Sequence, residues 1–244
     1  MRIALSGYGR MGKEIEAVAR ETGDEVVSIF EYDDPLTSGS KLNGAEVLIS
    51  FSQANAVLPV LRAAAEHRLP VVEGTTGWYD QLAEVKEISG LSLLYGPNFS
   101  LGVYQFMKII EKAAELVGVL GDYDTYIHEW HHSGKIDSPS GTARRLAEIV
   151  LGSFPGKREA QYDTCHRKIK PEELHVTSTR VGRIPGTHEV GFDSAADSIQ
   201  IRHTAHGREA FARGAVKAAH WIVSREGIFT MDDFMKSISE RTRT

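Results

Sequence analysis

Two histidines and a lysine lie within five residues, at His131, His132 and Lys135. A histidine can exchange a proton near neutral pH, and a lysine can supply a cation or a proton. A helix is expected to follow, with Ser138 as its cap and Pro139 as its first residue. The first N–H groups of such a helix have no partner inside it, so they can bind a carboxylate. Proton donors beside an anion-binding helix start predict a reaction on a small acid.

A glycine-rich turn lies close to the start of the chain, between a short apolar strand and a helix. The strand is expected at 2–6, and the buried face of the helix at Ile15, Val18 and Ala19. Glycines at these spacings permit a tight turn and let the backbone approach a pyrophosphate. We therefore expect a dinucleotide to bind at Gly7, Tyr8, Gly9, Arg10, Met11 and Gly12.

Glu31 ends the next predicted strand, nineteen positions after Gly12. A carboxylate at this distance is expected to bind the adenosine ribose, with a solvated acidic loop as the alternative because Asp33 and Asp34 follow. The same carboxylate repels a 2′-phosphate, and Tyr32 follows it instead of a basic residue. This favours NADH or weak discrimination, while Lys41 leaves NADPH possible.

Strand-like and helix-like segments alternate over the first hundred residues. Strands are expected at 25–30, 45–51, 70–73 and 91–95, and helices at 54–67 and 79–89. This alternation predicts an α/β fold with a Rossmann-type, doubly wound parallel sheet. Ligands bind at the carboxyl ends of such strands. Two strand ends are therefore expected to face the cofactor: Gly74, Thr75 and Thr76, and Gly96, Pro97, Asn98 and Phe99.

The pattern changes after residue 100. A helix at 103–117 is followed by period-two segments at 123–129, 174–180, 186–192 and 197–203. These predict a second, α+β domain with a mixed or largely antiparallel sheet. Helices are expected at 207–225 and 231–238. We assign the dinucleotide-binding domain to 1–99 with a C-terminal return at 210–244, and the second domain to 100–209.

The letters His128-Glu129-Trp130-His131-His132 match the H-E-x-x-H pattern of zinc hydrolases. That pattern needs a helix, whereas the preceding Tyr, Thr, Tyr and Ile favour a strand. No third ligand is evident, so we expect no metal. Histidines that are hydrogen-bonded in a core or exposed on a surface remain the alternative interpretation for any one of them.

The composition excludes several classes of protein. The formal net charge of −5 argues against nucleic-acid binding. The single Cys165 precludes an internal disulfide and fits a reducing compartment. No signal peptide or membrane span is expected, so we predict a cytoplasmic protein.

The segment from Glu129 through Lys135 to Ala143 resembles the signature of the 4-hydroxy-tetrahydrodipicolinate (dihydrodipicolinate) reductase family, which acts in the diaminopimelate route to lysine. The resemblance covers nearly the whole chain, and its histidine–lysine segment is the most specific part. It also includes the segments 7–12, 74–77, 98–103, 180–188 and 203–212.

The resemblance implies roles for individual residues. His131 would be a proton donor or acceptor, Lys135 a second proton donor, and His132 a substrate contact. Gly141 and Thr142 would hold one carboxylate of a small cyclic dicarboxylate substrate. It also implies reduction of 4-hydroxy-tetrahydrodipicolinate with NADH or NADPH by a cytoplasmic homotetramer joined through the sheet of the second domain.

Two features depart from the family pattern. Ser50 stands where the family usually has an acid, and Tyr32 stands where NADPH-preferring members have a basic residue. Two other functions also remain: another two-domain nicotinamide-dependent reductase, such as an amino-acid dehydrogenase, and a non-catalytic NAD(H) sensor. Neither requires the histidine–lysine segment.

Overall fold

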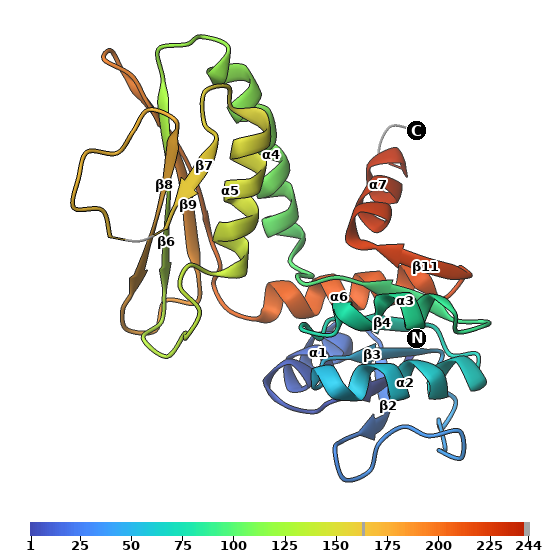
Figure 1. The fold of residues 1–244 in the computed structure, drawn as a ribbon. Helices are drawn as coiled ribbons and strands as arrows, with labels where there is room; N and C mark the ends of the chain where they lie inside the picture. Colours follow the sequence, from blue (N-terminus) through green and yellow to red (C-terminus); the bar gives the residue numbers. More distant parts are fainter. Residues whose placement is uncertain (163, 242–244) are drawn as a thin grey trace. The chain divides into compact units, whose positions relative to one another are not determined.

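The computed structural model describes residues 1–162 and 164–241. The chain divides into two units (Figure 1): Met1–Ser100 with the chain from Arg208 onward form unit 1, and Leu101–Gly207 form unit 2. The sequence therefore leaves unit 1 after Ser100 and returns to it at Arg208. The functional labels that we gave to two such domains remain predictions.

Unit 1 is built on a six-stranded sheet in the order β11-β5-β4-β3-β1-β2, with every neighbouring pair parallel. This confirms the predicted doubly wound parallel sheet. The strands are β1 (Arg2–Ser6), β2 (Glu25–Phe30), β3 (Val47–Ser50), β4 (Val71–Glu73), β5 (Ser92–Tyr95) and β11 (Gly227–Thr230).

Helices cover the sheet of unit 1. They are α1 (Arg10–Glu21), α2 (Ala54–Glu66), α3 (Leu82–Lys86), α6 (Glu209–Ile222) and α7 (Met231–Arg241), with a 3₁₀ turn η1 (Tyr79–Gln81). α6 packs against α1 and against β3, β4 and β5, while α2 and α3 share a core with Leu48 and Val71. The apolar face predicted at Ile15, Val18 and Ala19 is the buried face of α1. The carboxyl ends of β1, β3, β4 and β5 remain for loops that can bind a ligand.

Two expectations for unit 1 were incomplete. The helix expected at 79–89 is a 3₁₀ turn and a five-residue helix, Leu82–Lys86. β11 was not predicted, because Gly227–Thr230 is short and is defined by its parallel partner β5, more than 130 residues earlier.

Unit 2 contains a mixed five-stranded sheet in the order β10-β9-β6-β8-β7. β6 pairs antiparallel with β9 and parallel with β8, which confirms the predicted mixed sheet. The elements are α4 (Leu101–Gly118), β6 (Asp124–His131), α5 (Gly141–Ser153), β7 (Glu159–Gln161), β8 (Glu173–Arg180), β9 (Thr187–Asp193) and β10 (Ser198–Thr204). The short β7 was not predicted.

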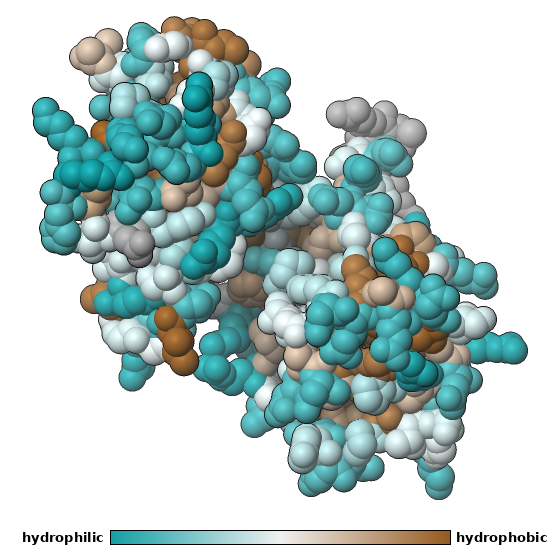
Figure 2. Space-filling model, in the orientation of Figure 1, coloured by the Kyte–Doolittle hydropathy of each residue, from teal (hydrophilic) through white to brown (hydrophobic). Residues whose placement is uncertain are grey.

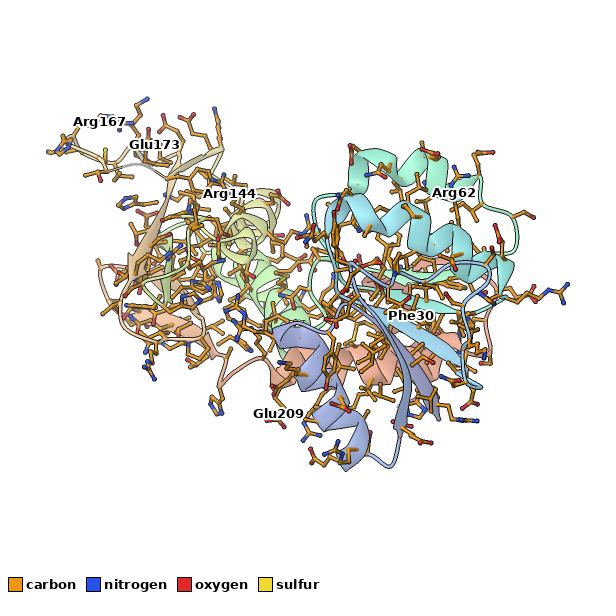
Figure 3. The ribbon with its side chains drawn as sticks, turned by 90° about the horizontal axis from the view of Figure 1, so that it is seen from below. Phe30, Arg62, Arg144, Arg167, Glu173 and Glu209 are labelled. Carbon is orange, nitrogen blue, oxygen red and sulfur yellow. The ribbon has the colours of Figure 1, made fainter. Side chains whose placement is uncertain are left out.

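α4 and α5 lie on one face of this sheet (Figure 1). Their core joins Phe106, Ile110 and Leu146 to Ile127, Val176 and other strand residues. Leu116, Val119 and Leu120 are exposed at the end of α4, where Figure 2 shows apolar atoms at the surface. At the start of β8, Arg167 forms an ion pair with Glu173, and both are labelled in Figure 3. Within the described residues, no helix is long and apolar enough to cross a membrane.

Candidate active site

Alternation along β6 sets which side chains belong to the site. Glu129 and His131 are buried, whereas His128 and Trp130 are half-buried and lie on the opposite face. The nitrogens of His128 lie within hydrogen-bond distance of the Thr177 and Thr179 hydroxyls on β8. The first two letters of the motif, His128 and Glu129, therefore lie on a strand, as the preceding residues predicted, with their side chains on opposite faces, and His132 follows the end of that strand.

Glu129 is the centre of a buried polar network and is 0% exposed. Its Oε1 accepts hydrogen bonds from the Ser140 backbone N–H at 2.9 Å, the Ser178 hydroxyl at 2.8 Å and Arg180 Nη2 at 2.9 Å. The Ser140 hydroxyl donates to Oε2. Burial opposes ionisation of this carboxyl, but the hydrogen bonds from His188, Ser140 and Arg180 outweigh it and hold the pKa of Glu129 well below its usual range. Glu129 is therefore a buried carboxylate that its donors stabilise.

Two histidine rings border Glu129. His131 Nδ1 and His188 Nε2 each lie 3.4 Å from Glu129 Oε2, and the two ring centroids are 5.1 Å apart. Burial lowers the pKa of His131 to about 4, although Glu129 opposes this effect. The imidazole of His131 is thus neutral near pH 7 in the ligand-free protein. A Cβ atom at Gly186 would lie 3.0 Å from His131 Nε2, so the backbone there also limits the position of the ring.

Lys135 lies in a turn directly after β6, where its N–H donates to the His132 carbonyl at 3.1 Å. Lys135 Nζ donates to both carboxylate oxygens of Asp137, at 2.7 and 2.9 Å. Burial opposes ionisation of Asp137, but the hydrogen bond from Lys135 keeps its pKa below the ordinary value. Arg180 Nη2 also donates to the Asp137 carbonyl at 2.6 Å. The turn that holds Lys135 is therefore connected to the Glu129 network through Arg180.

The start of α5 shows that the prediction of Ser138 as the helix cap was wrong. Ser140 caps the helix, with its hydroxyl accepting from Ala143 N–H at 3.1 Å, whereas Ser138 is exposed and precedes a cis peptide bond to Pro139. The cap lies two residues later because Ser140 also bonds Glu129. Gly141 has open space around its Cα, and helix geometry leaves the N–H groups of Gly141 and Thr142 without partners inside α5.

Glu129, His131 and His188 are a set of described residues that could hold a metal ion, since one ligand atom from each lies within 4.8 Å of the others. The Glu129 oxygens already accept four hydrogen bonds, and the Arg180 cation lies 2.9 Å from Oε1. A cation there would compete with these donors and meet the charge of Arg180. The absence of a required metal stays a prediction. We expect turnover to be unchanged after dialysis against EDTA, and a loss restored by a divalent metal would contradict it.

In unit 1, the glycine-rich turn follows β1 and leads into α1. Gly7 has φ +88°, and a Cβ there would lie 2.3 Å from the Phe51 carbonyl oxygen. A Cβ at Gly12 would lie 2.4 Å from the Gly7 carbonyl oxygen, so helix and turn approach closely. α1 begins after Gly9 without a side-chain cap and without an acidic residue in its first turn. Its first N–H groups can therefore receive a pyrophosphate.

The other residues predicted in this region differ in exposure. The Gly7 N–H donates to the Phe30 carbonyl at 2.8 Å, which places Glu31, exposed after β2, next to the turn. Arg10 is exposed, Met11 is half-buried, and the Tyr8 hydroxyl donates to Glu16. The geometry thus brings the glycine turn and the predicted ribose carboxylate together.

The predicted residues in the loops after β4 and β5 differ in their exposure to solvent. Thr75 is buried, whereas Gly74 is half-buried and Thr76 is exposed. After β5, Gly96 is buried against Met231, Pro97 is exposed and Asn98 is half-buried. Phe99 is 1% exposed and its ring packs edge-on against Phe51. Phe99 can therefore border a ligand only through its backbone.

Sequence reasoning gave no role to five residues of the Glu129 network. The β6–β8 register pairs His131 with Arg180, and the β6–β9 register pairs Glu129 with His188. These partners come from strands about 50 to 60 residues away, and no local pattern predicts such pairing. The only sequence feature that could have indicated a role for these residues is that several of them lie in the segments that resemble the family. The five are Glu129, Ser140, Ser178, Arg180 and His188.

Comparisons with known proteins identify relatives over nearly the whole chain. Residues 1–99 match the family described as dihydrodipicolinate reductase, N-terminus, and residues 102–235 match dihydrodipicolinate reductase, C-terminus. A 4-hydroxy-tetrahydrodipicolinate reductase of Christiangramia forsetii is 39% identical over 98% of this chain and 99% of its own length. The enzyme of the same name from Archaeoglobus fulgidus is 40% identical, over 97% and 100%.

Among solved structures, the dipicolinate-bound dihydrodipicolinate reductase from Paenisporosarcina sp. TG-14 is similar with a TM-score of 0.72 and 19% identity. The similarity covers 94% of this chain and 97% of that one. An amine dehydrogenase from Mycobacterium smegmatis has a TM-score of 0.56 at 10% identity, over 93% and 94% of the two chains. At these identities both similarities concern the fold alone.

Proposed function

The chain belongs to the dihydrodipicolinate reductase family, and from that premise we propose how its residues divide the reaction. It is an NAD(P)H-dependent oxidoreductase that reduces 4-hydroxy-tetrahydrodipicolinate in lysine and diaminopimelate biosynthesis. The family relation extends over both units. An amino-acid dehydrogenase or an NAD(H) sensor is therefore not favoured.

His131 and Lys135 are the proposed proton-handling residues. A bound reduced nicotinamide would supply hydride, the substrate ring must also gain a proton, and the 4-hydroxyl group leaves as water to give tetrahydrodipicolinate. A neutral His131 has one N–H and one lone pair, so it can donate or accept a proton. The Lys135 ammonium, oriented by Asp137, can donate a proton and attract an anionic substrate. The observation that supports these roles is the single network around Glu129, which connects His131, the Lys135 turn and the start of α5.

His132, Gly141 and Thr142 are the proposed substrate contacts. The first N–H groups of α5 can bind one carboxylate of the cyclic dicarboxylate, and the helix dipole favours the negative charge there. His132 stands at the start of the turn that carries Lys135. A carboxylate bound at Gly141 would therefore lie on the same unit as both proton-handling residues.

The proposed cofactor site in unit 1 uses the uncapped start of α1 for the pyrophosphate and Glu31 for the ribose. Glu31 and the 85% exposed Tyr32 offer no cation to a 2′-phosphate, which supports NADH preference or dual use. Lys41 is exposed and leaves some use of NADPH open. The loops at 74–76 and 96–99 follow neighbouring parallel strands, which supports a place for them beside the nicotinamide.

We also propose a homotetramer that forms through the uncovered face of the unit 2 sheet. Tyr126, His128 and Trp130 lie half-exposed on this face, and the helices cover the other one. The single cysteine, Cys165, is free, which supports function in a reducing compartment such as the cytoplasm.

Turnover of freshly prepared 4-hydroxy-tetrahydrodipicolinate with NADH and with NADPH tests these roles. We expect His131→Ala and Lys135→Ala to lower kcat/KM by about 100-fold or more, as expected when an acid–base group is lost. The exposed His166→Ala and Lys112→Ala are matched controls that should retain parent activity. NADH binding should remain intact in all four variants, because none lies in unit 1.

Two results would contradict parts of this proposal. Parent-like turnover in either site variant would remove that residue from the chemistry. A strong preference for NADPH, measured as the ratio of kcat/KM values, would refute the proposed NADH preference or dual use.

A further inference from the structure

Glu73 is a buried carboxyl group of unit 1 that the proposed chemistry does not use. It ends β4 and is 0% exposed. In register, it lies between Ser50 on β3 and Tyr95 on β5. A carboxyl group in such surroundings must be hydrogen-bonded or neutral, because an unpaired buried charge is strongly unfavourable. Ser50 is also the position where this sequence departs from the usual acid.

The carboxyl group of Glu73 fixes one residue of the loop that follows. Its Oε1 accepts from the Thr75 N–H at 2.7 Å. The Thr75 hydroxyl accepts from the Ser52 N–H at 2.9 Å, and the Thr75 carbonyl accepts from Trp78 Nε1 at 2.8 Å. Thr75 thus connects the loops at the ends of β3 and β4, and the hydrogen bond to Glu73 fixes the backbone of Thr75.

We propose that Glu73 is a positioning residue for the nicotinamide cofactor, acting through its hydrogen bond to the Thr75 backbone. This inference rests on the proposed cofactor site, in which Gly74, Thr75 and Thr76 border the nicotinamide. The loop has little freedom to adjust: a Cβ at Gly74 would lie 2.2 Å from the Phe51 ring. Loss of the Glu73 acceptor would leave the buried Thr75 N–H without its partner in this tightly packed loop, and would so disturb the surface that the cofactor contacts.

The same carboxyl group makes this positioning depend on pH. Burial raises the pKa of Glu73 to about 7, although hydrogen bonds from Thr75 and Ser50 oppose the shift. Tyr79 and Tyr95 are the titratable groups near it. The helices packed on this part of the sheet place their charged side chains at or toward the surface: Arg62 and Glu66 on α2, and Arg213, Lys217 and His220 on α6.

A bound NADH carries two negative charges on its pyrophosphate, and these would disfavour the charged form of Glu73 further. By linkage, the neutral form then binds the cofactor more tightly than the ionised form. NADH affinity should therefore fall as the pH rises through about 7.

Fluorescence titration of the full-length protein with NADH at pH 6.0, 7.0 and 8.5 tests the inference. Glu73→Ala removes the acceptor and should raise the Kd about tenfold, as expected for one buried hydrogen bond. Glu73→Gln keeps an acceptor without a charge, so its Kd at pH 6.0 should match the parent. The parent Kd should rise about threefold or more by pH 8.5, whereas Glu73→Gln should change little. The exposed Glu66→Gln is the matched control and should follow the parent.

The possible outcomes separate this inference from the proposed cofactor site. A folded Glu73→Ala protein, verified by its thermal unfolding, with the parent Kd at every pH would refute the role of Glu73 alone. If that variant does not fold, the pH dependence of Glu73→Gln decides, and a profile like the parent's would refute the role. A parent chain that binds no NADH would refute the proposed cofactor site and this inference with it.

Discussion

At the scale of single residues, Glu129 joins three separate parts of the chain. Its carboxylate receives hydrogen bonds from Ser140 at the start of α5 and from Ser178 and Arg180 on β8. Several hydrogen-bond donors compensate this buried carboxylate for its loss of hydration. A buried carboxylate without such donors would not remain ionised. Removing the charge therefore leaves Arg180, whose side chain is only 17% exposed, without its counter-ion.

We expect Glu129→Gln to destabilise the protein by about 3 kcal/mol, because breaking one partner of a buried ion pair leaves the other charge uncompensated. Glu148→Gln is the control, since its pair with Arg145 is more than half exposed and should contribute less than about 1 kcal/mol. Urea unfolding of both variants measures the difference. Equal losses in the two variants would show that the Glu129 network does not stabilise the fold.

His131 carries a prediction about pH. Its pKa in the folded protein, about 4, lies below the ordinary value of 6.5 because the ring is buried. Stability from the neutral ring is therefore complete above pH 6.5 and is lost as the pH falls toward 4. His128 and His203 have pKa values lowered by burial too, so a single variant is needed to isolate His131.

We expect the melting temperature of the parent to fall between pH 7 and pH 5, and His131→Asn to show a smaller fall over the same interval. NMR signals of the His131 ring should remain those of a neutral imidazole down to about pH 5 in the ligand-free protein. Protonation of this ring at pH 6.5 would refute the prediction and would make His131 a cationic acid instead.

At the scale of elements, the start of α5 depends on which serine caps it. Ser140→Ala removes the bond to Ala143 N–H and the hydroxyl that donates to Glu129. We expect a loss of about 1 kcal/mol or more from the cap alone, together with a higher KM for the substrate whose carboxylate this helix is proposed to hold. Ser138→Ala should change neither quantity, because Ser138 is exposed.

Thermal unfolding and steady-state kinetics on these two serine variants give the comparison. The expected order is the reverse of what the sequence favoured, since Ser138 followed by Pro139 is the more familiar helix start. A larger effect from Ser138→Ala would mean that the helix begins two residues earlier in solution.

The elements that sequence alone predicted are those with strong periodicity. The helices around Ile15, Val57 and Phe106 bury one apolar face, so their spacing predicts them whatever they pack against. Glu159–Gln161 and Gly227–Thr230 became strands because a neighbouring strand was available to pair with. Their short sequences contain no such information.

The candidate site likewise contains residues that the local sequence predicted and residues that only strand pairing brings there. His131, Lys135 and the helix that begins at Gly141 occupy one continuous segment, so their types and spacing predicted chemistry there. Arg180 and His188 join them only through the registers of β8 and β9 with β6. Register is a property of two strands at once, and this is why Arg180 and His188 were not predicted from the local sequence.

At the scale of the whole molecule, unit 1 is assembled from two separated segments of the chain. α6 packs against α1, and β11 completes the sheet beside β5. Asp24 connects the segments through polar contacts, since it accepts hydrogen bonds from the N-terminal amine at 3.0 Å and pairs with His220 at 2.9 Å. The core of unit 1 thus requires residues on both sides of unit 2 in the sequence.

The uncovered face of the unit 2 sheet underlies the proposal of a tetramer. Aromatic side chains with polar neighbours are typical of the centre of an interface. Here the Tyr126 hydroxyl donates to Glu189 at 2.9 Å, and the Arg202 guanidinium lies 5.1 Å from the Trp130 ring. These contacts hold the aromatic side chains in place before any association, which lowers the entropy lost when copies bind.

A charge on this face should therefore break the assembly. We expect the parent to have a mass near four times the 26.9 kDa of one chain, and Trp130→Arg to form smaller species at the same concentration, because Arg202 would repel a second cation beside it and that cation would lose its hydration on burial. Tyr104→Arg on α4 is the matched control, since that half-buried aromatic residue belongs to a helix on the other face of the sheet and should leave the mass unchanged. Sedimentation velocity measures all three masses. A monomeric parent, or a Trp130→Arg protein that remains a tetramer, would place the contacts between copies elsewhere.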